Sequence, residues 1–364
     1  MNIKFVSLDN IDFENNKVIP RNVTINDAKD YITSLINTIL STTKKREFES
    51  KKVSHTITNI NSIVNLFITK EEVASTLSSS KENSNNFNKN DYNTYTNTIA
   101  QKLLQEQITA TNKYKQLTRI QKGSLIQALV EYNNSIIYLS CLIEHSTFID
   151  ETDLKYKIGL PKSDKATLKS CMVHYSNKGD INTIYVSDSK PKIAEYWYDG
   201  FLELIPKRDN RTNTTQIYNS IRNTLNAKLS LSHKADCTNL NNALNVIFSK
   251  DGDSFNLSEC LDFLFNNYTP ISDKLIINDI RTIVETNIEK QKIDTVFDID
   301  NCDIKSKLKN IKYTITDNIE VKFKTSKTNL NDYVYSTTME GDEKVLIIKN
   351  ISEDAYYKFL PSED

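Results

Sequence analysis

The sequence is short of the two residues that most often interrupt regular structure. Glycine and proline number six each in 364 residues, well below ordinary usage, which argues against collagen-like, glycine-rich and many-turned all-β architectures. Hydrophobic residues make up 38% of the chain and charged residues 26%. That composition supports a sizeable core and excludes wholesale disorder. The length predicts two domains, or one large domain with insertions.

Paired cysteines and long apolar runs are also missing. The five cysteines form no C-x-x-C pair, and an odd, dispersed set is typical of buried thiols in a reducing cytosol. The first residues lack the basic-then-apolar layout of a signal peptide. No run approaches the roughly 18 apolar residues of a membrane helix. We therefore expect a cytoplasmic chain that does not enter a membrane.

Charge of one sign is absent as well. Lys and Arg total 46 against 47 Asp and Glu, a formal net charge of -1, so any contact with nucleic acid must come from a local basic patch. No G-x-x-x-x-G-K-[ST] or G-x-G-x-x-G motif occurs, which disfavours a nucleotide-driven motor. The four histidines form no H-E-x-x-H motif. The sequence predicts no metal site and no cofactor.

The pattern of apolar residues predicts an α+β fold, in which a central antiparallel hairpin sheet is followed by a helical segment and a C-terminal β-meander. Two hairpins are expected in the centre, 124–131 with 135–143 and 167–175 with 182–186. Expected helices cover 24–40, 60–68, 98–110, 214–229, 240–248, 257–266, 273–288 and 353–360. An apolar helical face is also expected from Pro191 to Pro206.

Three regions follow from this pattern. The first, 1–120, is an N-terminal α/β region that contains a Ser- and Asn-rich stretch at 77–97, expected to be a loop. The second, 121–230, holds the central sheet and helices. The third, 231–364, holds a helical segment and four strands at 311–316, 320–324, 333–337 and 344–349.

Several segments, taken in order, are similar to the core of the bacterial nucleoid-associated protein family named after NdpA and YejK. They are the first central hairpin, Ile149-Asp150-Glu151-Thr152-Asp153-Leu154, Thr183-Ile184-Tyr185-Val186-Ser187, the helix from Ile193 to Leu202, and the closing strands Ile319–Phe323 and Val345–Asn350. The resemblance covers roughly 60–70% of the chain and consists of pattern rather than an invariant motif.

The chain also departs from this family. The first strand, Phe5-Val6-Ser7-Leu8, has no His, and Ser189-Lys190-Pro191-Lys192 replaces the family's Lys-Gly-Arg before the helix. The resemblance implies a cytoplasmic, nucleoid-associated, non-catalytic protein that binds DNA. The departures leave open a housekeeping role or a role in a mobile element or genome defence.

Candidate DNA contacts are clustered lysines and arginines, since such side chains make most phosphate contacts. The turn around Lys207, Arg208 and Arg211 ranks first because two arginines in a short linker before a helix can grip phosphate. A loop that links the two central hairpins ranks next, and a basic run after the first helix completes the set. These two groups comprise Lys155, Lys157, Lys162, Lys165, Lys44, Lys45 and Arg46. No recognition-helix motif is visible, so little base specificity is expected. Pairing across a homodimer would add phosphate contacts.

Two alternatives stay open. One is an interaction or sensor subunit of a multi-protein assembly, such as a phage-defence complex, in which DNA contact is secondary. The other is a Mg²⁺-dependent nuclease, because Glu320-Val321-Lys322 forms an E-x-K on an expected strand and follows Asp298, Asp300 and Asp303. Nucleases of that type hold Mg²⁺ with an acid and an E-x-K on neighbouring strands. A three-residue match arises easily by chance.

Overall fold

The computed structural model describes residues 1–42, 44–76, 89–113, 122–133, 135–162, 168–190, 192–266, 268–308, 311–323, 334–339 and 341–360. The chain forms two compact units. Unit 1 comprises Met1–Asp209 with the short segments Ser254–Ser258 and Asp294–Phe297. Unit 2 comprises Asn210–Asp253, Glu259–Ile293 and Asp298–Asp364. The predicted α+β class is confirmed.

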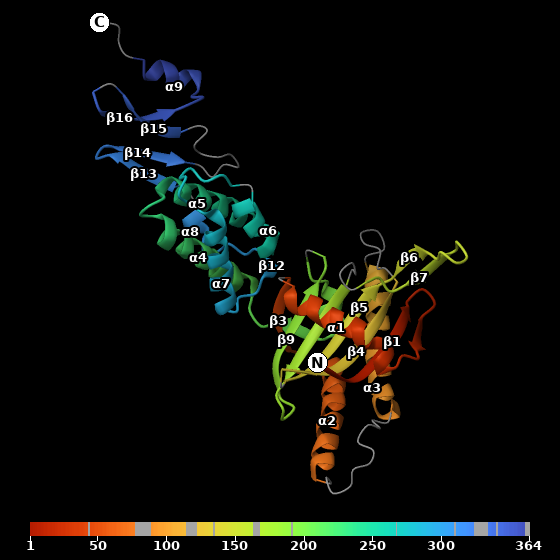
Figure 1. Ribbon diagram of the computed structural model, residues 1–364. Helices are drawn as coiled ribbons and strands as arrows, with labels where there is room; N and C mark the ends of the chain where they lie inside the picture. The colour runs from red at the N-terminus through yellow and green to blue at the C-terminus, as the bar shows by residue number, and fades with distance from the viewer. Residues whose placement is uncertain are drawn as a thin grey trace. The chain divides into compact units, whose positions relative to one another are not determined.

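Unit 1 is built on an eight-stranded sheet with the order β10-β3-β9-β8-β5-β4-β1-β2, seen from one side in Figure 1. Every pair of neighbouring strands is antiparallel. The strands are β1 (Asn2–Asp12), β2 (Lys17–Arg21), β3 (Lys45–Ser50), β4 (Gly123–Tyr132), β5 (Ser135–Glu144), β8 (Leu168–Tyr175), β9 (Ile181–Asp188) and β10 (Leu204–Pro206).

The two predicted central hairpins are confirmed as β4–β5 and β8–β9 and lie side by side through the pairing of β5 with β8. The N-terminal strands extend this centre on both flanks, since β1 pairs with β4 and β3 pairs with β9. The sheet is therefore twice as wide as the four strands expected from local hairpins. Non-local pairing of this kind leaves no short-range signal in the sequence.

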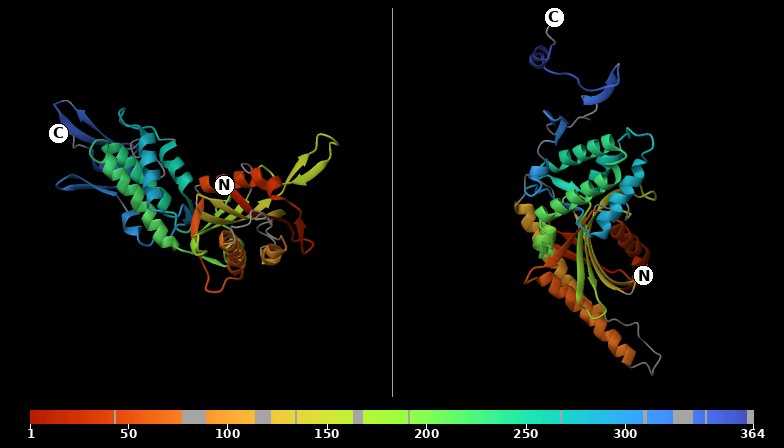
Figure 2. Two further views of the ribbon diagram at one scale, coloured as in Figure 1. Left: turned by 60° about the horizontal axis from the view of Figure 1, so that its bottom comes forward. Right: turned by 90° about the vertical axis from the view of Figure 1, so that its left-hand side faces the viewer.

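Helices cover both faces of the sheet, which explains why β4 and β5 are apolar along nearly their whole length. On one face lies α1 (Ile25–Ser41), whose Ile32, Leu35 and Ile36 pack with β4 and β5. On the other face lie α2 (His55–Thr76) and α3 (Lys89–Lys113) with Trp197 and Phe201. The right-hand view of Figure 2 shows α1 and α2 on opposite sides of the sheet.

Helix α1 begins where its capping residues place it. The Thr24 hydroxyl accepts the Asp27 N–H at 3.2 Å, and the Asp27 carboxylate accepts the Thr24 N–H at 3.2 Å. This reciprocal capping box satisfies two backbone donors that have no partner within the helix. The helix predicted at 24–40 is thus confirmed.

Two predictions for the N-terminal region need correction. The helix expected at 60–68 is one part of the 22-residue α2. The loop expected at 77–97 is wrong from Lys89 onward, because α3 begins there; its other residues, 77–88, lie outside the described residues. The Asn- and Thr-rich composition at 89–97 hid this helix, whose inner face is carried by Tyr92 and Thr96.

The helical segment expected from Pro191 to Pro206 needs correction, because the helix found there is a π-helix, η2 (Tyr196–Phe201), and Leu204–Pro206 forms the strand β10. Trp197 and Phe201 are fully buried with ring centroids 4.9 Å apart. The interpretation of these aromatic residues as core is confirmed. Pro191, the expected first-turn residue, lies outside the described residues.

Unit 2 contains α4 (Asn210–Leu229), α5 (Lys234–Phe248), most of α6 (Leu257–Leu261), the π-helical η3 (Asp262–Asn266), α7 (Ile277–Lys290) and α8 (Lys305–Leu308). The two-stranded pair of β11 (Ser254–Asn256) and β12 (Val296–Asp298), which belongs to unit 1 except for Asp298, was not expected. The four helices predicted between 214 and 288 are present. Their ends differ by a few residues, and the span 257–266 is an α-helix continued by π-helix.

The last strands form two separate hairpins in the part of the chain that the structure describes, rather than one continuous meander. One hairpin is β13 (Ile311–Thr316) with β14 (Ile319–Phe323), and the other is β15 (Val334–Met339) with β16 (Glu343–Ile348). Helix α9 (Glu353–Lys358) follows. The expected boundaries at 120/121 and 230/231 each fall inside a unit, because the sheet joins β1 to β4 and α4 packs with α5.

Candidate functional site

The main candidate site is a group of ionic side chains at the β3–β10 edge of the sheet. Asp294, in the segment that joins α7 to β12, lies beside β3 and accepts the backbone N–H of Glu47 at 2.9 Å. Arg208, just after β10, contacts Asp294 and Glu47, each at 3.2 Å. These contacts bring together residues that lie about 160 and 250 positions apart.

Further cations surround the two carboxylates. Lys207 Nζ lies 2.6 Å from Glu47 Oε1. Arg46 donates to the Arg208 carbonyl oxygen at 2.7 Å and lies 3.7 Å from Asp294. Thr295 accepts the backbone N–H of Lys45 and donates to its carbonyl oxygen, which fixes the neighbouring part of β3. We call Lys45, Arg46, Glu47, Lys207, Arg208 and Asp294 the β3 basic cluster.

The β3 basic cluster carries a surplus of positive charge at its outer side. It has four cations and two carboxylates, so its formal charge is +2. The carboxylate side chains of Glu47 and Asp294 are only 8% and 3% exposed, whereas the Lys207 side chain is 47% exposed. The Arg208 and Arg46 side chains are 23% and 11% exposed, so Lys207 is the cation through which the cluster can first meet an anion.

Two side chains beside the cluster, His174 and Tyr185, have shifted pKa values. Lys45 Nζ lies 5.5 Å from the centroid of the Tyr185 ring, and Tyr185 meets His174 edge-on at 5.9 Å. Burial lowers the pKa of His174, and the nearby charge of Lys45 lowers it further. Burial raises the pKa of Tyr185, to which Glu47 also contributes. His174 and Tyr185 are therefore uncharged neighbours of the cations.

The other residues predicted to contact DNA lie in different settings. Arg211 forms an ion pair with Asp303. Lys157 Nζ lies 2.5 Å from Asp150 and 3.6 Å from Asp153, so acids of its own hairpin balance its charge. Lys155 and Lys162 are exposed. Lys44 lies directly before β3, and Lys165 lies outside the described residues.

The structure thus brings Lys45, Arg46, Lys207 and Arg208 into one cluster and leaves Arg211 and the 155–162 lysines elsewhere. The segment 155–165, expected as a loop, begins instead with a strand. This strand, β7 (Tyr156–Gly159), pairs with β6 (Ser146–Ile149) in a separate hairpin. The roles of all these residues in DNA binding stay predictions.

The E-x-K of the nuclease alternative lies on β14, with both side chains exposed. Its expected acidic companions have other contacts: Asp303 pairs with Arg211, and an Asp300 oxygen accepts the backbone N–H of Cys302. Across the described ranges, no three His, Cys, Asp or Glu side chains lie close enough to hold a metal ion.

Cys171 and His174 lie on opposite faces of β8, as strand alternation predicts. Cys171 belongs to the core on the α2 and α3 side, and burial raises the pKa of its thiol. His174 lies opposite Thr183 of the neighbouring strand β9, and its side chain is on the other face of the sheet. These two residues do not form a nucleophile and base pair.

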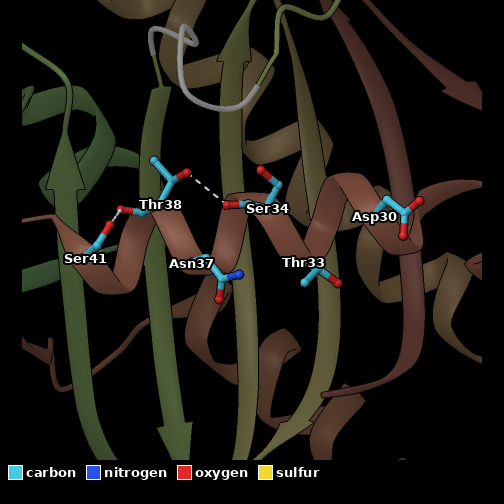
Figure 3. Close-up of a pocket in the computed structure, with 6 residues that line it drawn as sticks. All are labelled: Asp30, Thr33, Ser34, Asn37, Thr38 and Ser41. Atoms are coloured by element: carbon cyan, nitrogen blue, oxygen red, sulfur yellow. Dashed lines mark hydrogen bonds between the residues drawn. The ribbon is translucent and has the colours of Figure 1, made fainter.

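A depression on the surface lies along the solvent side of α1 (Figure 3). Its lining comes from this helix alone: Asp30, Thr33, Ser34, Asn37, Thr38 and Ser41. Thr38 and Ser41 hydroxyls are engaged with the helix backbone, at 2.9 Å from Ser34 O and 3.1 Å from Thr38 O respectively. One carboxylate among hydroxyl and amide groups of a single helix gives this surface no convergent chemistry.

The sequence did not reveal two features of the structure. It did not identify Glu47 and Asp294 as partners of the basic residues, because Asp294 comes from a distant segment. It also missed β6–β7, whose second strand, Tyr-Lys-Ile-Gly, alternates apolar residues with others and follows an acidic turn. That alternation was the available signal, although four residues are few for a strand.

No protein-family model and no curated protein matches this chain. The resemblance to the nucleoid-associated family therefore stays a prediction. Among the helices whose residues the structure describes, none is long and apolar enough to cross a bilayer.

Proposed function

We propose that this protein binds DNA through the phosphate backbone, with little base specificity and without catalysis, and that the β3 basic cluster is the contact surface. The observation that carries the proposal is the layered charge of this cluster, with two buried carboxylates beneath a surplus of cations. Association with the nucleoid in the cytoplasm follows from the same proposal.

The buried carboxylates of Glu47 and Asp294 orient Arg208 and also neutralise part of the positive charge of the cluster. Glu47 and Asp294 each contact the guanidinium of Arg208, so the arginine is held in one orientation before a ligand arrives. A cation that is already oriented loses less conformational entropy on binding phosphate. Lys207 and Lys45 supply two further cations, one beside Glu47 and one over the Tyr185 ring.

A salt series tests this function. A duplex of about 30 base pairs is titrated with the protein between roughly 50 and 200 mM KCl, and the slope of log affinity against log salt is measured. We expect affinity to fall steeply, and Lys45→Gln with Lys207→Gln to reduce the slope by about 2, or about 1 for each phosphate contact. Binding that is absent or independent of salt contradicts the proposal.

Matched controls separate local from general charge effects. Lys4→Gln and Lys122→Gln remove the same charge from lysines that pair with acids outside the cluster, Glu131 and Glu14 respectively. These variants are expected to keep the salt slope of the unmodified protein. An equal loss in both sets would show that net charge, rather than the β3 basic cluster, determines binding.

A second candidate function, an interaction subunit of a larger assembly, is favoured by a different observation. The β6–β7 hairpin exposes large apolar side chains, and such patches typically mark protein interfaces. Co-purification of a stoichiometric protein partner together with absent DNA binding would favour this alternative.

A further inference from the structure

The β6–β7 hairpin, residues Ser146–Gly159, projects from the eight-stranded sheet of unit 1 (Figures 1 and 2). Its strands form a two-stranded sheet of their own. An isolated hairpin is marginally stable in water, and further strands or a packed face are needed for independent stability. We call this hairpin the arm.

The two faces of the arm differ because directly paired residues point to the same side. Thr147 pairs with Ile158 and Ile149 pairs with Tyr156, so these four side chains share one face. That face carries no charge. Tyr156 is 78% exposed and Ile158 is 69% exposed, values expected of lysines rather than of large apolar residues.

The opposite face carries ionic contacts and an aromatic ring, and its Phe148 is 49% exposed. Phe148 pairs with Lys157 on that side, and its ring lies against Gly159, where a Cβ atom would approach Phe148 Cε1 to 3.0 Å. Lys157 bridges Asp150 and Asp153. The ionic contacts and the Phe148 ring thus stabilise one side, and the uncharged face is left in water.

We propose that the uncharged face of the arm binds the same face of a second copy of this chain, so that the protein is a two-fold symmetric homodimer. A two-fold axis brings identical surfaces together and requires that they be self-complementary. An uncharged face meets its own copy without like-charge repulsion. The charges at the turn have both signs, Asp150, Glu151 and Asp153 against Lys155 and Lys157.

The available area suits this partner. An aromatic side chain offers on the order of 150–250 Å² and an aliphatic one somewhat less, so Ile149, Tyr156 and Ile158 at their observed exposure, together with Thr147, present on the order of 400 Å². Two copies together bury about 800 Å², which is in the range of weak, transient interfaces. A micromolar dissociation constant is therefore expected, rather than an obligate dimer.

Sedimentation equilibrium of the full chain over about 1–100 µM tests the dimer in this concentration range. The unmodified protein is expected to pass from 41.8 kDa toward twice that mass. The variant with Ile149→Thr, Tyr156→Thr and Ile158→Thr keeps β-forming residues and is expected to weaken association at least tenfold. Val53→Thr with Leu231→Thr is the control, since these apolar residues are similarly exposed elsewhere.

Hydrogen exchange provides a second measurement that needs no variant. Amides of 146–159 are expected to exchange at least tenfold more slowly at high than at low concentration, while the turn 176–180 is unchanged. A protein that stays monomeric with concentration-independent exchange overturns the proposal, as does a dimer that survives the three arm substitutions. DNA binding does not enter either readout, so the outcome is separate from that of the salt series.

Discussion

Two hairpins that follow one another in the chain have opposite surroundings. Only His145 separates β5, the second strand of the hairpin β4–β5, from β6, the first strand of the arm. Eight consecutive residues of β4 are buried, whereas three of the four residues of β6 and of β7 are exposed. Both hairpins have complete antiparallel pairing. The difference shows that backbone pairing alone does not bury a strand, since burial here comes from the helices on both faces of the main sheet.

The largest expected effect tests the buried hairpin. Leu139 on β5 is fully buried among α1 side chains, so Leu139→Ala removes apolar contacts and leaves a cavity. We expect the free energy of unfolding to fall by about 2–5 kcal/mol. Urea denaturation followed by fluorescence of Trp197, the single tryptophan, reports the unfolding of unit 1. A loss below about 0.5 kcal/mol would mean that burial contributes no more to the stability of β4–β5 than to that of the arm.

The next effect concerns β3, whose two buried residues, Glu47 and Phe48, are held by ionic contacts and by packing respectively. Asp294→Ala removes the acceptor of the Glu47 N–H and one partner of Arg208. We expect a loss of about 1–3 kcal/mol, because buried polar groups lose their partners. Asp262→Ala is the control, since this half-exposed carboxylate pairs with Arg281 at the surface. Equal losses in the two variants would contradict the buried ionic role of Asp294.

A smaller, pH-dependent effect is expected at the junction of the two hairpins. The His145 ring lies 2.8 Å from Ser124 Oγ, and burial, followed by the charges of Arg21 and Lys122, lowers the pKa of His145. The folded state thus disfavours the protonated ring. Its contribution to stability is present above the ordinary pKa of 6.5 and is lost as pH falls through the lowered value.

Urea midpoints measured from pH 7.5 down to 5, bracketing the ordinary histidine pKa, check this prediction. The variant His145→Gln should lose less stability over this range than the unmodified protein does. Some pH dependence of the urea midpoint remains in that variant, because burial lowers the pKa of His174 as well. A variant that follows the unmodified protein at every pH would exclude a role for His145.

The smallest effect tests the arm. Ile158 on β7 is largely exposed, so Ile158→Thr should change the free energy of unfolding of the monomer by less than about 0.5 kcal/mol. Dilute protein is required, so that association through the arm does not contribute. A loss of 2 kcal/mol or more would show that the arm is part of the core, and would remove the contrast with β4–β5.

Much of the fold could be predicted from the sequence because its signals are local. The helix pattern and the capping Thr24 fixed α1 to within a residue, and Tyr132-Asn133-Asn134 marked the turn of β4–β5. In contrast, β3 carries alternating charges in Lys45-Arg46-Glu47-Phe48-Glu49 and resembles a solvated run. Its burial depends on β9 and on Asp294, far away in the chain, which local patterns do not encode.

The candidate site was predicted in part. Lys207, Arg208 and Arg46 were recognised as basic residues, and their convergence follows from the pairing of β10 with β3. The acids that orient them were not recognised, because a carboxylate becomes a partner only through tertiary contacts. The arm was seen only as a projecting lysine-bearing loop, since four-residue strands carry too little alternation to be distinguished from a loop.

The placement of β1 and β3 on the two flanks of the sheet has a consequence for biosynthesis. Leu8 pairs with Ile126 and Phe48 pairs with Ile184, so each N-terminal strand meets its main partner only after more than a hundred further residues have been made. During translation these strands emerge first and remain with open edges for seconds. An open strand edge is a template for pairing with another chain, so aggregation during synthesis is expected to begin at β1 or β3.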